Sequence, residues 1–127
     1  MLPQEIRLLV VEDNADLLEL LASILSHQGW QVSASQRPDA ALQNAHQYPP
    51  ALLITDHDMP GCTGLTLLER LRDLEGLDRL PAILLSGHAS GHLPLPDDVL
   101  WLQKPITPSQ LCMTVERMLG RRTATTH

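Results

Sequence analysis

The stretch Leu52–Gly64, LLITDHDMPGCTG, carries the most information about the fold. It begins with apolar and β-branched residues that do not alternate with polar ones, which predicts a strand over Ala51–Thr55 that is buried on both faces. Asp56, His57 and Asp58 follow at once. Because a buried charge is costly without a partner, acids at the end of such a strand indicate that a ligand binds there.

The rest of the chain repeats this apolar pattern in alternation with helical patterns. Further strands are predicted over Ile6–Val11, Trp30–Ala34, Pro81–Leu85 and Val99–Leu102. Helices are predicted from the Asn14 cap to Gly29, from Pro38 to Pro49, over Leu65–Leu74, and from a capping box at Thr107–Gln110 to Gly120. This alternation predicts an α/β domain of the doubly wound, flavodoxin-like type, with five parallel strands in the order 2-1-3-4-5.

One segment departs from the alternation. Between Ser86 and Val99 the sequence SGHASGHLPLPDD contains Gly87, Gly91 and two prolines, which leave little room for a helix. We therefore expect the fourth helix to be replaced by a loop or shortened to one turn.

Composition limits the class of protein. A chain of 127 residues fits one domain, which we assign to residues 1–120, with 121–127 as a tail or the start of a linker. The net charge of −6 disfavours binding to bare nucleic acid or to an anionic membrane. No apolar run reaches the length of a membrane span, and the N-terminus lacks a signal-peptide pattern. Cys62 and Cys112 match no zinc spacing and are expected to be free thiols in the cytoplasm.

Polar residues follow four of the predicted strands. Glu12 and Asp13 end the first strand, Asp56 the third and Ser86 the fourth, and Lys104 follows the fifth. The carboxyl ends of parallel strands meet at one edge of the sheet, where ligands bind. Three carboxylates in one place call for a hard cation, Mg²⁺ or Mn²⁺. Together with a lysine and a hydroxyl, they are suited to phosphoryl transfer.

These motifs resemble the receiver domain of two-component response regulators. The resemblance extends from Ile6 to Leu119, and its motifs are Val-Val-Glu12-Asp13-Asn14, Asp56-His57-Asp58-Met59-Pro60 with Gly64, Ser86-Gly87 and Lys104-Pro105. It implies that Asp56 is the phosphoacceptor and that Asp13 and Asp56 bind Mg²⁺ directly. Glu12 would act through water, and the backbone carbonyl of Asp58 would complete the protein ligands.

The resemblance also implies how the domain signals. Lys104 would pair with the phosphoryl group, the Ser86 hydroxyl would bond to it after phosphorylation, and Trp101 would be the switch aromatic. The peptide bond between Lys104 and Pro105 would be cis, as is usual in the family. The donor would be a sensor histidine kinase or a phosphotransfer domain, and the output partner is not named by the sequence. Such a domain is a phosphoacceptor, with only its own phosphorylation and dephosphorylation as chemistry.

The residues leave several alternatives open. Asp58 and His88 resemble two variable positions that tune acyl-phosphate lifetime in receivers. His57, His88 and His92 could hold a transition metal, although loop histidines are more often solvated. The short segment between Ser86 and Lys104 leaves open whether the usual dimer face is present. An aspartyl-phosphate phosphatase of the haloacid-dehalogenase type and a receiver-like module that works without phosphorylation are the rival functions.

Overall fold

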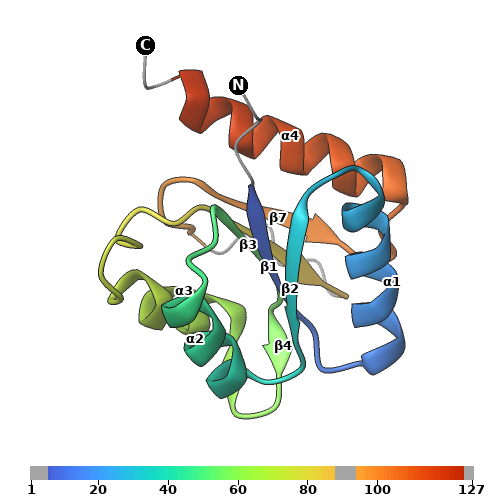
Figure 1. Ribbon diagram of the computed structural model, residues 1–127. Helices are drawn as coiled ribbons and strands as arrows, with labels where there is room; N and C mark the ends of the chain where they lie inside the picture. Colours follow the sequence, from blue (N-terminus) through green and yellow to red (C-terminus); the bar gives the residue numbers. More distant parts are fainter. Residues whose placement is uncertain (1–5, 88–93, 125–127) are drawn as a thin grey trace.

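A five-stranded parallel sheet forms the centre of the molecule. The computed structural model describes residues 6–87 and 94–124. The strands lie in the order β2-β1-β3-β6-β7, as predicted, and every neighbouring pair is parallel (Figure 1). Their bounds are β1 (Arg7–Val11), β2 (Gln31–Ser35), β3 (Leu52–Asp56), β6 (Ala82–Ser86) and β7 (Val99–Gln103). A separate antiparallel pair, β4 (Asp58–Met59) and β5 (Cys62–Thr63), follows β3.

In the part of the chain that the structure describes, two helices cover each face of the sheet. They are α1 (Ala15–His27) and α4 (Pro108–Ala124) on one face, and α2 (Pro38–Gln47) and α3 (Gly64–Arg72) on the other (Figure 1). The central strands β1, β3 and β6 are buried almost throughout, which explains why their sequences are apolar without alternation. In the part of the chain that the structure describes, no helix combines the length and apolar content that a bilayer span requires.

The predicted caps largely determine where the helices begin and end. The Asn14 side chain accepts a hydrogen bond from the Leu17 N–H at 3.0 Å, and the Thr107 hydroxyl accepts one from the Gln110 N–H at 3.0 Å. Gly29 follows α1 with a φ of 101°, a conformation that glycine adopts without steric cost. The expected end at Gly120 is wrong, because α4 continues through this glycine to Ala124. Gly120 is not in the left-handed conformation that ends a helix.

The segment between β6 and β7 is where the sequence predicts a loop or a single turn in place of a fourth crossover helix. Its described residues, Gly87 and 94–98, are not helical, and the rest of this expectation, over 88–93, lies outside the described residues. Leu95 packs against the core on the α2 and α3 face. The Arg72 guanidinium fastens this loop to α3, because it donates to the Leu80 carbonyl at 2.8 Å and to the Asp97 carbonyl at 3.1 Å. The described residues that lead into β7 are therefore held against the α2 and α3 face of the sheet.

Candidate functional site

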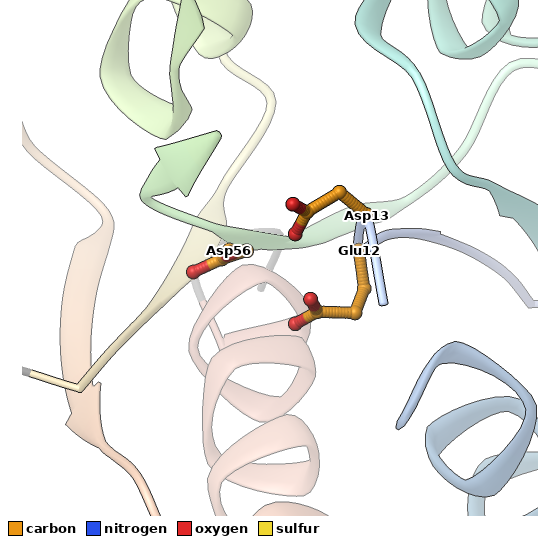
Figure 2. Close-up of side chains that lie close together, drawn as sticks. All are labelled: Glu12, Asp13 and Asp56. Atoms are coloured by element: carbon orange, nitrogen blue, oxygen red, sulfur yellow. The ribbon is translucent and has the colours of Figure 1, made fainter. Parts of the chain in front are cut away.

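Three carboxylates converge at the carboxyl end of the sheet. Glu12 and Asp13 come directly after β1, and Asp56 is the last residue of the neighbouring β3. One carboxylate oxygen from each lies within 4.8 Å of the other two, and Figure 2 shows the three side chains grouped together. Glu12 and Asp56 are buried, whereas Asp13 is exposed. The cluster is thus open to solvent on the side of Asp13.

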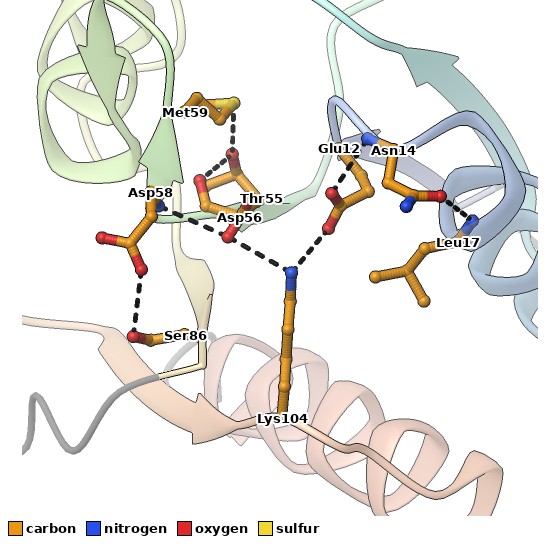
Figure 3. Close-up of polar contacts among 9 residues, drawn as sticks. All are labelled: Glu12, Asn14, Leu17, Thr55, Asp56, Asp58, Met59, Ser86 and Lys104. Atoms are coloured by element: carbon orange, nitrogen blue, oxygen red, sulfur yellow. Dashed lines mark hydrogen bonds and ion pairs between the residues drawn. The ribbon is translucent and has the colours of Figure 1, made fainter.

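Lys104 bridges the two buried members of this cluster. Its Nζ donates to Glu12 Oε1 at 3.0 Å and lies 3.4 Å from Asp56 Oδ1 (Figure 3). Glu12 Oε2 accepts a second hydrogen bond from the Asn14 N–H at 3.1 Å. The peptide bond between Lys104 and Pro105 is cis, as the resemblance implies. Since Lys104 supplies one positive charge against three carboxylates, the site favours a further cation.

The pKa values of Glu12, Asp56 and Lys104 are all raised above their ordinary values, but not for the same reason. Burial raises the pKa of Glu12 and of Asp56, and hydrogen bonds and the nearby ammonium only partly offset the effect. For Lys104 burial acts to lower the pKa, but the hydrogen bond to Glu12 and the charge of Asp56 outweigh it, so its pKa is raised. The ionised forms of Glu12 and Asp56 are therefore destabilised when no metal is bound. Lys104 stays protonated.

These shifts predict that the metal-free protein gains stability from Asp56 as the pH falls. The folded state binds the proton on Asp56 more tightly than the unfolded state, whose carboxyl pKa is about 4. Unfolding therefore becomes less favourable as the pH drops from about 7 through the raised pKa towards about 4. The Asp56→Asn variant should lack this contribution to the pH dependence of the free energy of unfolding. It should be about 0.5–2 kcal/mol more stable than the wild type near neutral pH. Urea unfolding with a chelator present measures both, and a variant that loses relative stability near pH 7 would contradict the sign.

The backbone fixes the position of Asp56 from several sides. Its Oδ1 accepts a hydrogen bond from the Asp58 N–H at 3.3 Å, and its carbonyl accepts one from the Thr55 hydroxyl at 2.9 Å. Gly64, the first residue of α3, lies so close that a Cβ there would be 3.0 Å from the Asp56 carbonyl oxygen and 3.1 Å from His57 Cα. The start of α3 and the end of β3 are thus in direct backbone contact.

Ser86 and Trp101 lie on the two strands beyond Asp56. Ser86 is buried at the end of β6, and its hydroxyl donates to Asp58 Oδ2 at 3.3 Å (Figure 3). Trp101, half-buried in the middle of β7, packs on the α2 and α3 face. The His57 ring meets the Trp101 ring edge to face, with centroids 4.8 Å apart and planes at 86°. Trp101 therefore contacts the residue that follows Asp56.

Sequence reasoning missed the contact between His57 and Trp101 and the short β4–β5 pair. Alternation along β3 places His57 on the opposite face from Asp56, and this signal was available. Among the described residues, Glu12, Asp13 and Asp56 form the only group suited to hold a metal, and His57 is not part of it. His88 and His92 lie outside the described residues. The donor set at the cluster consists of carboxylate oxygens, which suits Mg²⁺ or Mn²⁺.

Most of the chain matches one family. Residues 8–116 match the family model of the response regulator receiver domain, so the chain belongs to this family. It is a receiver domain of two-component signalling, with an acidic pocket of Glu12, Asp13 and Asp56 that is typical of metal sites in receivers.

Individual relatives agree with this assignment. The chain is 34% identical over 121 residues to the phosphate regulon transcriptional regulatory protein PhoB of Rhizobium meliloti, covering 91% of this chain and 52% of that protein. It is 29% identical over 128 residues to the phosphoglycerate transport system transcriptional regulatory protein PgtA of Salmonella typhimurium, covering 96% and 30%. The chain thus spans about half or less of these two relatives. Among solved structures, the receiver domain of the hybrid histidine kinase CckA matches with a TM-score of 0.75 and 32% identity, over 89% of this chain and 98% of that one.

Proposed function

We propose that this domain accepts a phosphoryl group on Asp56 from the phosphohistidine of a sensor histidine kinase or a phosphotransfer domain. The observation that carries the proposal is the buried Asp56 carboxylate, which lies 3.4 Å from the Lys104 ammonium and in one cluster with the acids Glu12 and Asp13. A carboxylate oxygen of Asp56 attacks phosphorus as the nitrogen–phosphorus bond breaks. The electron pair stays on the imidazole nitrogen, which is then protonated, and Asp56 carries an acyl phosphate.

The residues around Asp56 would bind the cation and the phosphoryl group in this step. Asp13, Asp56 and the Asp58 carbonyl would hold Mg²⁺, or Mn²⁺ in its place, with Glu12 acting through water; when bound, the cation neutralises charge on the phosphoryl oxygens. Lys104 lies 3.4 Å from Asp56, so its ammonium can pair with a phosphoryl oxygen after a small movement. Hydrolysis of the acyl phosphate returns Asp56 to its starting state, so the domain acts as a switch that resets.

Phosphorylation would change the surface around β7. The new group adds about −1.5 to −2 charges and strong hydrogen-bond acceptors, which attract Lys104 and the Ser86 hydroxyl. Trp101 contacts His57, the neighbour of Asp56, so a shift at the phosphoacceptor can reach the Trp101 ring through one packed contact. The domain would thus exchange between two states, and an output partner would bind one of them. We place this signalling in the cytoplasm.

An apolar groove beside Lys104 supports docking of a donor protein. It has a volume of about 460 Å³ and is lined mainly by α1 and by the segment that leads into α4, with Leu17, Leu20, Ile24, Lys104, Ile106 and Leu111 among its residues. Leu20, one of the lining residues, is 56% exposed, so its apolar side chain is accessible to a partner. A donor seated in this groove would lie next to the ammonium that faces Asp56.

Incubation with acetyl phosphate or a small phosphoramidate tests the proposal. With Mg²⁺ present, the intact mass of the wild-type chain should rise by one phosphoryl group, and a chelator should prevent the rise. Multiple turnover of a phosphomonoester, with no stable change in mass, would instead favour the phosphatase interpretation. If the protein neither gains mass nor turns over a substrate, the result would favour the third interpretation, a receiver-like module that works without phosphorylation.

Trp101 should report the change of state by its fluorescence. In a Trp30→Phe background, which removes the other tryptophan, emission should change when beryllofluoride, a phosphoryl mimic, is added with Mg²⁺. The reason is that Trp101 contacts His57 directly beside the phosphoacceptor. Fluorine NMR can show independently that the protein binds beryllofluoride. If binding occurs and the tryptophan emission does not change, Trp101 is not part of the switch.

A further inference from the structure

The side chain of Asp58 makes a contact that its backbone role does not require. Its N–H donates to Asp56 Oδ1 at 3.3 Å, and its carbonyl is the expected metal ligand. Its carboxylate points the other way, towards β6, where Oδ2 accepts the hydrogen bond of the Ser86 hydroxyl at 3.3 Å (Figure 3). One residue is therefore bonded both to the phosphoacceptor and to the hydroxyl expected to serve it.

A serine hydroxyl has one proton and can donate one hydrogen bond in full at a time. The phosphoryl group proposed for Asp56 needs that proton as a donor, and Asp58 already engages it. We propose that the Asp58 carboxylate is a positioning residue that holds the Ser86 hydroxyl away from the phosphoryl site and so opposes the phosphorylated state. This inference rests on the proposed function of Asp56.

The backbone on both sides leaves rotation of the Ser86 side chain as the simplest way to change partner. Asp58 is fixed by its pairing with Thr63 in the β4–β5 ladder. Ser86 pairs with Gln103 on β7, and its carbonyl accepts the Lys104 N–H at 2.7 Å. A donor–acceptor distance of 3.3 Å is long for a hydroxyl bonded to a carboxylate, so this hydrogen bond is weak enough to exchange. The hydrogen bond between Ser86 and Asp58 therefore favours the unphosphorylated arrangement but can still be broken.

Asp58 would also repel a phosphoryl group by charge alone, and the two effects can be separated. Charge repulsion acts whether or not Ser86 has its hydroxyl. The competition for the proton exists only when both side chains are present. A double-mutant cycle between positions 58 and 86 therefore isolates the competition.

Affinity for beryllofluoride, measured by fluorine NMR with Mg²⁺ present, is the readout. The proteins are the wild type, Asp58→Ala, Ser86→Ala and the double variant. Asp58→Ala should lower the dissociation constant of beryllofluoride in both backgrounds. The factor of this decrease should be about three to ten times larger when Ser86 is present than in the Ser86→Ala background. Asp58→Asn retains an acceptor oxygen without the charge and should fall between wild type and Asp58→Ala. Asp16→Asn, which removes an exposed charge from the first turn of α1, is the control and should bind like wild type.

The outcomes separate this inference from the proposed function. Equal effects of Asp58→Ala in both backgrounds would mean that Asp58 acts by charge alone, and would overturn the inference while leaving the function of Asp56 intact. Weaker binding in Asp58→Ala would overturn it as well. If the wild type neither binds beryllofluoride nor gains a phosphoryl group, the proposed function fails and this inference fails with it. Because Asp58 is exposed, its variants are expected to fold, and thermal unfolding checks this.

Discussion

The Asp56→Asn variant is expected to gain no phosphoryl group under conditions that add one to every wild-type chain. An amide oxygen is a far weaker nucleophile than a carboxylate, and the amide cannot form the same acyl phosphate. Asparagine has nearly the same shape, so the hydrogen bond from the Asp58 N–H and the packing around the end of β3 should persist. Intact mass after incubation with acetyl phosphate and Mg²⁺ measures the difference.

Asp39→Asn provides the matched control for this experiment. Asp39 is an exposed acid whose carboxylate pairs with Arg37 at 3.5 Å, and its replacement removes one negative charge without touching Asp56. It should be phosphorylated like the wild type. An Asp56→Asn chain that gains the same mass would remove Asp56 from its role and direct attention to Asp13, the exposed neighbour in the same cluster.

Mg²⁺ is expected to stabilise the wild type strongly and the Asp13→Asn variant little. A ligand that binds only the folded state adds about 2.7 kcal/mol at a concentration one hundred times its dissociation constant. Relief of the repulsion among Glu12, Asp13 and Asp56 is one of the contributions to the affinity of the folded protein for the cation. Asp13 is exposed, so its amide variant should fold as well as the wild type without metal.

Urea unfolding with and without Mg²⁺ measures this effect. Asp16→Asn, three residues further along and exposed, should respond to Mg²⁺ as the wild type does. Equal stabilisation of wild type and Asp13→Asn would show that the cation binds elsewhere. No stabilisation of either protein would count against a magnesium site in this domain.

The order of the elements was predictable because burial on both faces leaves a strong apolar signal. Strands such as Leu52–Asp56 are short apolar runs that differ in length and pattern from the amphipathic helices around them, and their predicted bounds differ from the observed ones by about one residue. The end of α4 was not predictable from Gly120, since a glycine ends a helix only when its backbone leaves the helical conformation. The β4–β5 pair is too short to have a periodic pattern.

For the candidate site, the sequence predicted which residues meet but not how they contact one another. Parallel strands bring Glu12, Asp13 and Asp56 to one edge, whatever the details of packing. The pairing of Lys104 with Glu12, across an interval of 92 residues, and the hydrogen bond between Ser86 and Asp58 depend on side-chain distances that no spacing rule supplies. The catalytic and switch roles of these residues stay predictions.

The close approach of Gly64 to β3 determines which substitutions the phosphoacceptor can tolerate nearby. A methyl group at this position would press on the Asp56 carbonyl and on Leu84 Cδ2, at 3.0 and 3.1 Å. The Leu84 side chain can yield, whereas the carbonyl belongs to the residue whose carboxylate carries the chemistry. Alanine generally favours a helix more than glycine does, but here its methyl group would require the backbone at the end of β3 to give by a few tenths of an ångström. A substitution that stabilises α3 locally would therefore press on the backbone of the residue that carries the chemistry.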